Sequence, residues 1–285
     1  MILKIENICY KAEDKIILDD INLSFNNGIY ALLGLNGAGK TTLMKILSTY
    51  CQPTSGNILY KNVSILQQPQ KLQVDLSFMS QNIGLIQDFT VEQNLYYFGL
   101  LKGCNAKELK LNIVNTIEQF DLKSFKSTKI LNLSGGVKQR IGIALALISS
   151  PKILILDEPI NNLDHYERER FYFLLKKLSK TCIIILSTHL IDEIENIAKN
   201  VIFMRNGKIT FCGELQNCLF NISQDIKEEV IEAIDYPQLQ EKYQLIKFQL
   251  ENNLLKIRYF TSKRVETTSP TFEDAFVYYT KYASL

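Results

Sequence analysis

Apolar residues gather in short runs along most of the chain, and polar or glycine-rich turns separate these runs. Runs of this kind are typical of buried strands, whereas apolar residues at every third or fourth position indicate helices. The strands expected on this basis are 2–5, 16–25, 29–33, 56–60, 75–80, 153–156, 182–187 and 201–211. The last of these contains Asn206 and Gly207, a pair that favours a two-residue hairpin turn. Strands and helical segments alternate, which predicts an α/β fold.

Residues 82–133 have helical patterns in place of strands. Thr90 and Gln93 have the spacing of a capping box at a helix start. Helical spacing recurs further along at Leu109, Ile113, Ile117 and Phe120. We therefore expect a small helical subdomain over about residues 82–150.

The pattern changes again from about residue 216. Segments 243–250 and 254–260 alternate apolar and polar residues on either side of a turn at 251–253, which favours a β-hairpin. Segment 269–280 then reads as a capped helix with Pro270 in its first turn. Its apolar face would consist of Phe272, Phe276 and Tyr279. We expect residues 216–285 to form a small C-terminal α+β extension after a first domain of residues 1–215.

Composition places these elements in an ordinary globular chain. The 285 residues are 46% hydrophobic and 22% charged, enough for one large or two modest domains. A net charge of +2 gives no reason to expect nucleic-acid binding. The six cysteines have no metal-ligand spacing, so reduced thiols in the cytoplasm fit best.

No membrane span or secretion signal is expected either. The apolar stretches 141–148 and 182–186 are far shorter than a bilayer-spanning helix. Glu6 interrupts the N-terminal residues before any apolar core of a signal peptide can form.

A glycine-rich segment between the expected strand 29–33 and a helix at 41–48 carries the first chemical motif. It fits the P-loop pattern of two glycines four residues apart, followed by lysine and a hydroxyl residue. The segment consists of Gly34, Leu35, Asn36, Gly37, Ala38, Gly39, Lys40, Thr41 and Thr42. Its backbone N–H groups would hold phosphates, Lys40 would reach the β and γ phosphates, and Thr41 would bind Mg²⁺. A nucleotide-binding P-loop NTPase core follows from this motif.

Two adjacent carboxylates, Asp157 and Glu158, follow the apolar run 153–156. In open α/β sheets the ligand chemistry lies at the carboxyl ends of the strands. Asp157 would bind Mg²⁺ through water, and Glu158 would polarise the water that attacks the γ-phosphate.

The segment 133–140 supplies a third motif. Ser134 can cap a helix while its hydroxyl and the N–H groups of Gly135 and Gly136 point at an anion. Taken alone, the same residues are far more often those of an ordinary capped helix. The other motifs decide between these two interpretations.

The order of these motifs resembles that of the ATP-binding-cassette (ABC) ATPase family over roughly residues 1–215. For the fold, this similarity implies a P-loop NTPase core with a mixed β-sheet, an antiparallel β subdomain and a helical subdomain. The resemblance implies that Gln81 joins the Mg²⁺ shell and senses the γ-phosphate, and that His189 contacts this phosphate and steadies the attacking water. It also implies that Ser134, Gly135 and Gly136 complete the ATP site of a second ABC ATPase subunit. The loop 161–164 would lie between the subunits, but Asn162 stands where the family usually has glycine.

The residue that stacks on adenine in this family is harder to place. Tyr10 is the candidate near the N-terminal strand, although an ungapped match would put Ala12 at this position. A tyrosine that packs only at the sheet edge explains Tyr10 equally well.

The resemblance extends to transport. Segments 88–95 and 269–280 are similar to those of drug, lantibiotic and polysaccharide exporter ATPases. We therefore expect an ATPase subunit with ATP and Mg²⁺ as cofactors, most simply a homodimer, bound to transmembrane permease subunits at the cytoplasmic face of the membrane. Segment 82–89 and the aromatics Tyr96, Tyr97 and Phe98 would receive the permease, unless these aromatics serve core packing. An importer-type ATPase and a soluble ABC ATPase acting on ribosomes or DNA remain alternatives.

Overall fold

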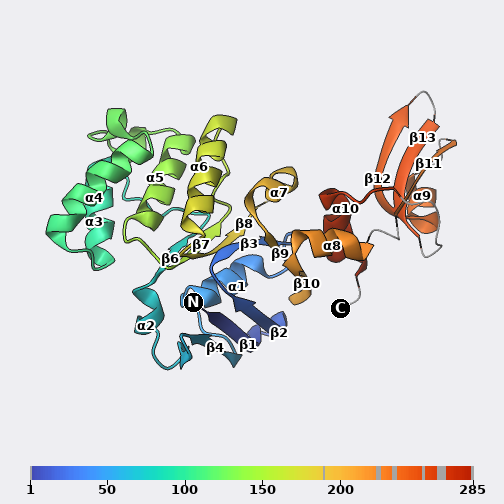
Figure 1. Ribbon diagram of the computed structural model, residues 1–285, viewed down its shortest axis with the longest axis horizontal. Helices are drawn as coiled ribbons and strands as arrows, with labels where there is room; N and C mark the ends of the chain where they lie inside the picture. Colours follow the sequence, from blue (N-terminus) through green and yellow to red (C-terminus); the bar gives the residue numbers. More distant parts are fainter. Residues whose placement is uncertain are drawn as a thin grey trace.

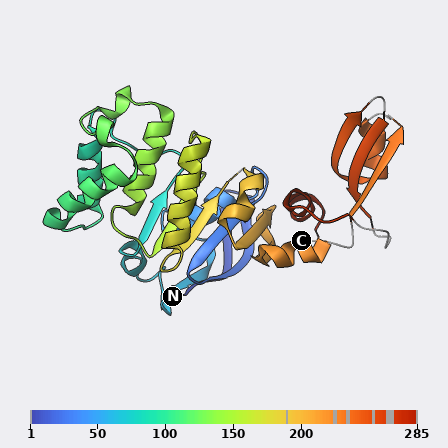
Figure 2. The ribbon, with the colours of Figure 1, turned by 45° about the horizontal axis from the view of Figure 1, so that its top comes forward.

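The computed structural model describes residues 2–188, 190–222, 226–232, 236–251, 254–261 and 268–283. The described parts form an elongated molecule (Figures 1 and 2). A helical region lies at one end, two sheets form the centre, and a small sheet lies at the other end. This arrangement confirms the α/β fold with mixed and antiparallel sheets.

The central sheet has six strands in the order β10-β9-β3-β8-β7-β6. Its strands are β3 (Gly28–Leu33), β6 (Leu76–Met79), β7 (Ile153–Asp157), β8 (Ile183–Ser187), β9 (Asn200–Arg205) and β10 (Lys208–Glu214). All neighbours pair in parallel except β9 and β10, which pair antiparallel. Every residue of β7 and β8 is buried, which explains their unbroken apolar runs.

The turn between β9 and β10 confirms the expected hairpin. Asn206 and Gly207 have φ angles of 48° and 79°. Positive φ at both central residues is the requirement of a type I′ turn, and asparagine and glycine meet it at the lowest steric cost.

A second sheet, in the order β2-β1-β4-β5, packs beside the first. Its strands are β1 (Leu3–Ala12), β2 (Lys15–Phe25), β4 (Ser55–Tyr60) and β5 (Val63–Ser64), and all pairs are antiparallel. Strand β1 is longer than the strand predicted at 2–5. Strand β1 continues through a register shift near Asn7, whose φ is 50°, and this irregularity breaks the sequence alternation.

Helices cover the central sheet and form the helical region. They are α1 (Lys40–Leu47), α2 (Gln70–Gln73), α3 (Val91–Leu101), α4 (Ala106–Gln119), η1 (Lys123–Phe125), η2 (Ile130–Asn132), α5 (Gly135–Leu147), α6 (His165–Leu178), η3 (Ile191–Glu193) and α7 (Ile194–Ile197). The capping box of α3 is present with Thr90 and Gln93, as expected. Leu109, Ile113 and Ile117 form the buried face of α4. In the described part of the chain, every helix is too short or too polar to cross a bilayer.

The C-terminal part begins with α8 (Leu215–Ile222). A three-stranded antiparallel sheet follows, with β11 (Ile226–Glu232), β12 (Gln244–Glu251) and β13 (Leu254–Phe260) in the order β11-β13-β12, together with α9 (Tyr236–Lys242). Strands β12 and β13 pair antiparallel, as expected for a hairpin. Its turn residues Asn252 and Asn253 lie outside the described residues.

The last helix starts later than its sequence predicts. Helix α10 (Phe272–Val277) begins after Pro270, and Thr271 is its N-cap, with Asp274 completing a capping box. Pro270 therefore precedes the helix, because the threonine side chain provides the stronger cap. The chain then continues as the π-helical turn η4 (Tyr278–Tyr282).

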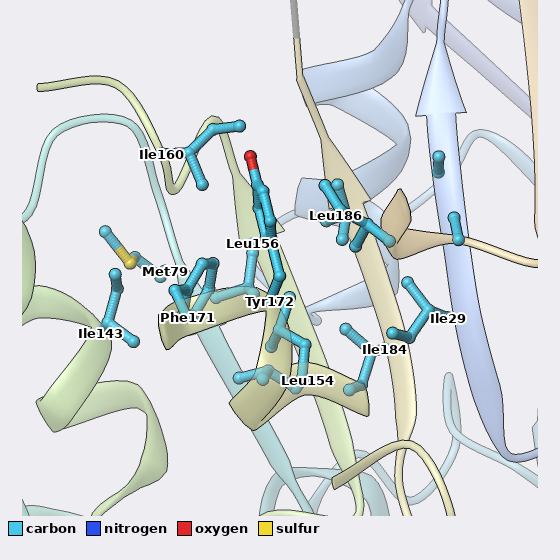
Figure 3. Packing of buried hydrophobic residues seen from close by; sticks show 14 of the residues in the cluster. Ile29, Met79, Ile143, Leu154, Leu156, Ile160, Phe171, Tyr172, Ile184 and Leu186 are labelled. Atoms are coloured by element: carbon cyan, nitrogen blue, oxygen red, sulfur yellow. The ribbon is translucent and has the colours of Figure 1, made fainter. Parts of the chain in front are cut away.

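An aromatic cluster attaches the last helix to the central sheet. The ring centroid of Phe203 in β9 lies 6.0 Å from that of Phe272, 6.3 Å from that of Phe276 and 5.1 Å from that of Tyr279. The predicted aromatic face of this helix is thus confirmed. The main core cluster runs without interruption from the helical region through the central sheet to Phe272 and Tyr279. Figure 3 shows its part around β7, β8 and α6.

Candidate functional site

The glycine-rich loop joins β3, in the middle of the central sheet, to α1. Gly39 is the N-cap of α1, and no side chain caps this helix. Uncapped N–H groups at a helix start are the groups that bind phosphate. Leu35, Asn36 and Gly37 are exposed at the tip of the loop, whereas Ala38 is buried beneath it.

Close packing leaves no room for a side chain at Gly34 and Gly39 of this loop. A Cβ on Gly34, whose φ is 155°, would lie 2.4 Å from the carbonyl oxygen of Met204. A Cβ on Gly39, whose φ is 103°, would lie 2.8 Å from Cδ2 of Leu18. The loop is therefore pressed between β9 and β2, and larger residues would displace it.

Lys40 is buried at the base of the loop, with 8% of its surface exposed. Its Nζ donates hydrogen bonds to the carbonyl oxygens of Gly34 (2.7 Å) and Leu35 (3.2 Å). Burial lowers the pKa of Lys40, and the nearby carboxylates of Glu158 and Asp157 oppose this shift. The motif lysine and the acid pair, far apart in sequence, thus face the same site.

Asp157 ends strand β7 and is 4% exposed. One of its carboxylate oxygens accepts a hydrogen bond of 2.6 Å from Oγ of Ser187, the last residue of the neighbouring strand β8. The same Oγ accepts a bond of 3.0 Å from the backbone N–H of Glu158. Ser187 therefore fixes both members of the acid pair at the carboxyl ends of two adjacent strands.

Glu158 leaves the strand in a left-handed conformation, with φ at 53°. Its Oε2 accepts hydrogen bonds from Nε2 of Gln81 (3.1 Å) and from Nδ2 of Asn161 (2.6 Å). Gln81 follows β6, the neighbour of β7 in the sheet. The structure thus brings Gln81 and Glu158 together at the same edge of the sheet.

Ser134 caps α5 by accepting a hydrogen bond of 3.5 Å from the N–H of Val137. A Cβ on Gly136 would lie 2.9 Å from the carbonyl oxygen of Asn162, so this helix start packs closely on the loop 161–164. Ser134 and Gly135 are exposed. In both views of the described chain, α5 and α1 lie in different parts of the molecule (Figures 1 and 2). The serine-glycine helix start and the glycine-rich loop thus belong to different parts of the described chain.

Tyr10 lies in β1 opposite Leu18 of β2, and Leu18 in turn touches the glycine-rich loop. The Tyr10 ring is half-buried and packs against the core cluster beneath that sheet. Tyr10 is thus one strand away from the loop. Stacking on adenine stays a prediction.

His189 lies outside the described residues. Its neighbour Thr188 is 4% exposed, and the N–H of Leu190 donates a hydrogen bond of 3.0 Å to Oγ1 of Thr188. The predicted role of His189 is not tested by these contacts.

Sequence reasoning assigned no role at the acid pair to Ser187, Asn161 or Gln139. Gln139, 5% exposed, donates from Nε2 to the carbonyl oxygen of Pro159 at 2.7 Å. Each of these residues lies inside a quoted motif segment or within three residues of a motif residue. Proximity to a motif was the only available signal, because their contacts depend on tertiary structure.

The donor set fits a magnesium nucleotide. The carboxylate of Asp157 and the hydroxyl of Thr41 are oxygen ligands of the type that Mg²⁺ prefers. The uncapped start of α1 and the buried cation of Lys40 suit phosphate groups. A mixed, mainly parallel sheet with this loop and acid pair, together with a helical region that contains a serine-glycine helix start, defines an ATP-binding cassette.

Comparison with known sequences and structures agrees with this class. The ABC transporter family profile matches residues 18–161. The ABC transporter ATP-binding protein NatA of Bacillus subtilis is 31% identical over 204 residues, which cover 70% of this chain and 82% of NatA. The chain therefore belongs to the ABC transporter ATP-binding proteins.

Solved structures share the fold. The ATP-binding subunit of an ABC transporter superposes with a TM-score of 0.72 at 23% identity, covering 78% of this chain and 93% of that subunit. The cassette MJ0796, in a dimeric post-hydrolysis state bound to ADP and Pi, has a TM-score of 0.68 at 26% identity. The match covers 75% of this chain and 98% of MJ0796. Among longer relatives, human ABCA3, a phospholipid-transporting ATPase, is 31% identical over 70% of this chain. The chain spans only 12% of ABCA3 and 8% of the rat ATP-binding cassette sub-family A member 2.

Proposed function

We propose that this chain binds Mg-ATP and hydrolyses it as a head-to-tail dimer, and that the cycle of closure and release drives a separate membrane permease. The observation that carries this proposal is the convergence of Lys40, Asp157 and Glu158 at the carboxyl ends of the central strands. These side chains provide the phosphate, metal and water contacts of phosphoryl transfer.

Each side chain has a separate task in this proposal. The buried ammonium of Lys40 exchanges its loop carbonyls for phosphate oxygens and neutralises their charge. Asp157, fixed by Ser187, presents its carboxylate toward the metal. Glu158, held by Gln81 and Asn161, accepts a proton from the attacking water. Bound Mg²⁺ would supply charge stabilisation at the phosphates.

The second half of each ATP site would come from another subunit. Ser134, Gly135 and Gly136 begin α5 away from the glycine-rich loop of their own chain. A head-to-tail dimer would place them against the γ-phosphate bound by the other subunit. The dimeric MJ0796 cassette, with 26% identity to this chain, supports such an assembly. We propose a homodimer as the simplest form.

Transport would require permease subunits at the cytoplasmic face of the membrane. The candidate docking surface includes Tyr97, which is 42% exposed and has ring contacts with Phe89 (5.9 Å) and Phe98 (5.4 Å). An exposed aromatic group of this kind suits a protein interface. The similarity of segments 88–95 and 269–280 to those of exporter ATPases favours export. The proposed cargo is a peptide, an antibiotic or a lipid-type molecule, and the relative ABCA3 is a phospholipid-transporting ATPase.

Two measurements test this function. Purified protein should turn over Mg-ATP, and a chain without turnover would be a non-enzymatic binding module. A tagged chain should co-purify with a polytopic membrane protein from detergent-solubilised membranes. Co-purification with ribosomes or DNA would instead indicate a soluble ABC ATPase, and recovery with an extracellular substrate-binding protein would indicate an importer.

A further inference from the structure

A cluster of three polar side chains joins α6 to the segment that follows His189. Glu193, in η3, binds two residues of α6 at once. Arg168 Nη1 lies 2.9 Å from one carboxylate oxygen of Glu193, and the hydroxyl of Tyr172 donates a hydrogen bond to the other oxygen. Both oxygens of one carboxylate are thereby held by residues one helical turn apart.

The cluster is partly shielded from solvent, so water and salt screen it less than an exposed surface ion pair. Tyr172 is 5% exposed, and the side chains of Arg168 and Glu193 are 21% and 24% exposed. Figure 3 shows Tyr172 among the apolar side chains of β7 and β8. Burial, with the bond to Glu193, raises the pKa of Tyr172, so its hydroxyl remains a proton donor at neutral pH.

Helix α6 continues directly from the loop 161–164. Asp164 caps this helix and forms a capping box with Glu167, so the loop and the helix start are rigidly joined. The loop itself touches the start of α5 through Asn162 and Gly136. A displacement at the loop would therefore move Arg168 and Tyr172, and through them Glu193.

We propose that Arg168, Tyr172 and Glu193 are positioning residues that couple the loop 161–164 to the segment after His189. This inference rests on the proposed dimeric ATPase. Closure of a second subunit on the loop would set the position of α6, and Glu193 would transmit that position to the segment that carries His189 in the sequence. The cluster would thus act on the hydrolytic step and leave nucleotide binding to the glycine-rich loop.

The test separates turnover from binding in the full-length chain. Glu193→Gln keeps the shape of the side chain but removes the charge, and we expect kcat to fall about tenfold. Affinity for a fluorescent ATP analogue and the KM for ATP should stay within about twofold, since the phosphate contacts are unchanged. Tyr172→Phe should lower kcat by a smaller factor, because the ion pair remains.

A double variant that exchanges the two charges of the ion pair provides the strongest test. Arg168→Glu combined with Glu193→Arg restores the ion pair in the opposite direction and should recover kcat to within about threefold of the unmodified chain. Arg168→Glu alone should remain impaired. As a control, Glu214→Gln breaks the exposed Lys199–Glu214 pair of 2.8 Å and should leave kcat unchanged.

The possible failures are distinguishable. An unmodified chain without ATP turnover would overturn the proposed function and this inference with it. An active chain whose Glu193→Gln variant has normal kcat would overturn only the inference. Loss of kcat together with equal losses of affinity and melting temperature, or no recovery on charge exchange, would assign the cluster to stability alone.

Discussion

Gln139, in the helix that begins with Ser134, donates a hydrogen bond of 2.7 Å to the backbone carbonyl of Pro159, directly after Glu158. Gln139 is 5% exposed, and its Nε2 also donates a longer hydrogen bond of 3.4 Å to the carbonyl oxygen of Glu158. One helix thus begins at the cap Ser134 and supports the acid turn of the same chain. In the proposed dimer, this connection would give the two ATP sites a direct physical route for coupling.

The first prediction concerns this hydrogen bond. Gln139→Leu leaves the carbonyl of Pro159 without its donor and frees the turn that holds Glu158 in its left-handed conformation. We expect kcat for ATP to fall at least tenfold, with a loss of about 1–3 kcal/mol in the free energy of unfolding. Steady-state turnover and chemical denaturation measure the two effects. The matched control Gln73→Leu breaks an exposed bond to Thr49 and should change neither; normal turnover in Gln139→Leu would disprove the coupling.

Ser134→Arg tests the proposed trans half-site. Ser134 is exposed at the start of α5, a different part of the molecule from α1 in Figure 1, so the bulky cation should block only the contact with another subunit. Turnover should disappear, while the isolated chain should bind ATP with normal affinity in a fluorescence titration. Weaker ATP binding by the single chain would show that Ser134 belongs to the site of its own chain.

The pH dependence of ATP binding follows from Lys40. Burial lowers its pKa from the ordinary 10.5, so the unliganded chain loses this positive charge at a lower pH than an exposed lysine does. Because the charged form binds phosphate, affinity for ATP should decline as the pH rises toward 10.5. The Lys40→Arg variant stays charged over this range and should have a flatter profile. Equal profiles for both proteins would contradict the assigned contact.

The attachment of the last helix can be tested by stability. Phe272 is 3% exposed and packs on Phe203 with a centroid distance of 6.0 Å. Phe272→Ala should lower the free energy of unfolding by about 3–5 kcal/mol, measured by denaturant titration. Phe173, which is 74% exposed, offers the control, and its replacement by alanine should cost no more than about 0.5 kcal/mol. Similar values for both variants would mean that α10 is only loosely attached.

Sequence patterns predicted the elements whose signals are local. The run 153–156, the turn at Asn206 and Gly207, and the capping box at Thr90 each depend on neighbouring residues, and all are present. The full length of β1 was missed, because its pairing passes through an irregularity at Asn7. Boundaries of this kind depend on partner strands.

The candidate site divides in the same way. Lys40, Asp157 and Glu158 were identified because their motifs have characteristic spacing. Ser187 could not be assigned its role, because a serine at the end of a strand has no distinctive sequence context. Its bonds to both acids exist only because β7 and β8 are neighbours in the sheet.

In the proposed dimer, ATP joins two chains through Ser134 of one and the glycine-rich loop of the other. The most direct measurement is the mass in solution of the Glu158→Gln variant, by light scattering, with and without ATP. We predict one chain without ATP and two chains with ATP, because the dimer forms but hydrolysis cannot release it. Adding Ser134→Arg to this variant should return the mass to one chain. A single-chain mass for Glu158→Gln at saturating ATP, or a dimer that persists with Ser134→Arg, would contradict the account.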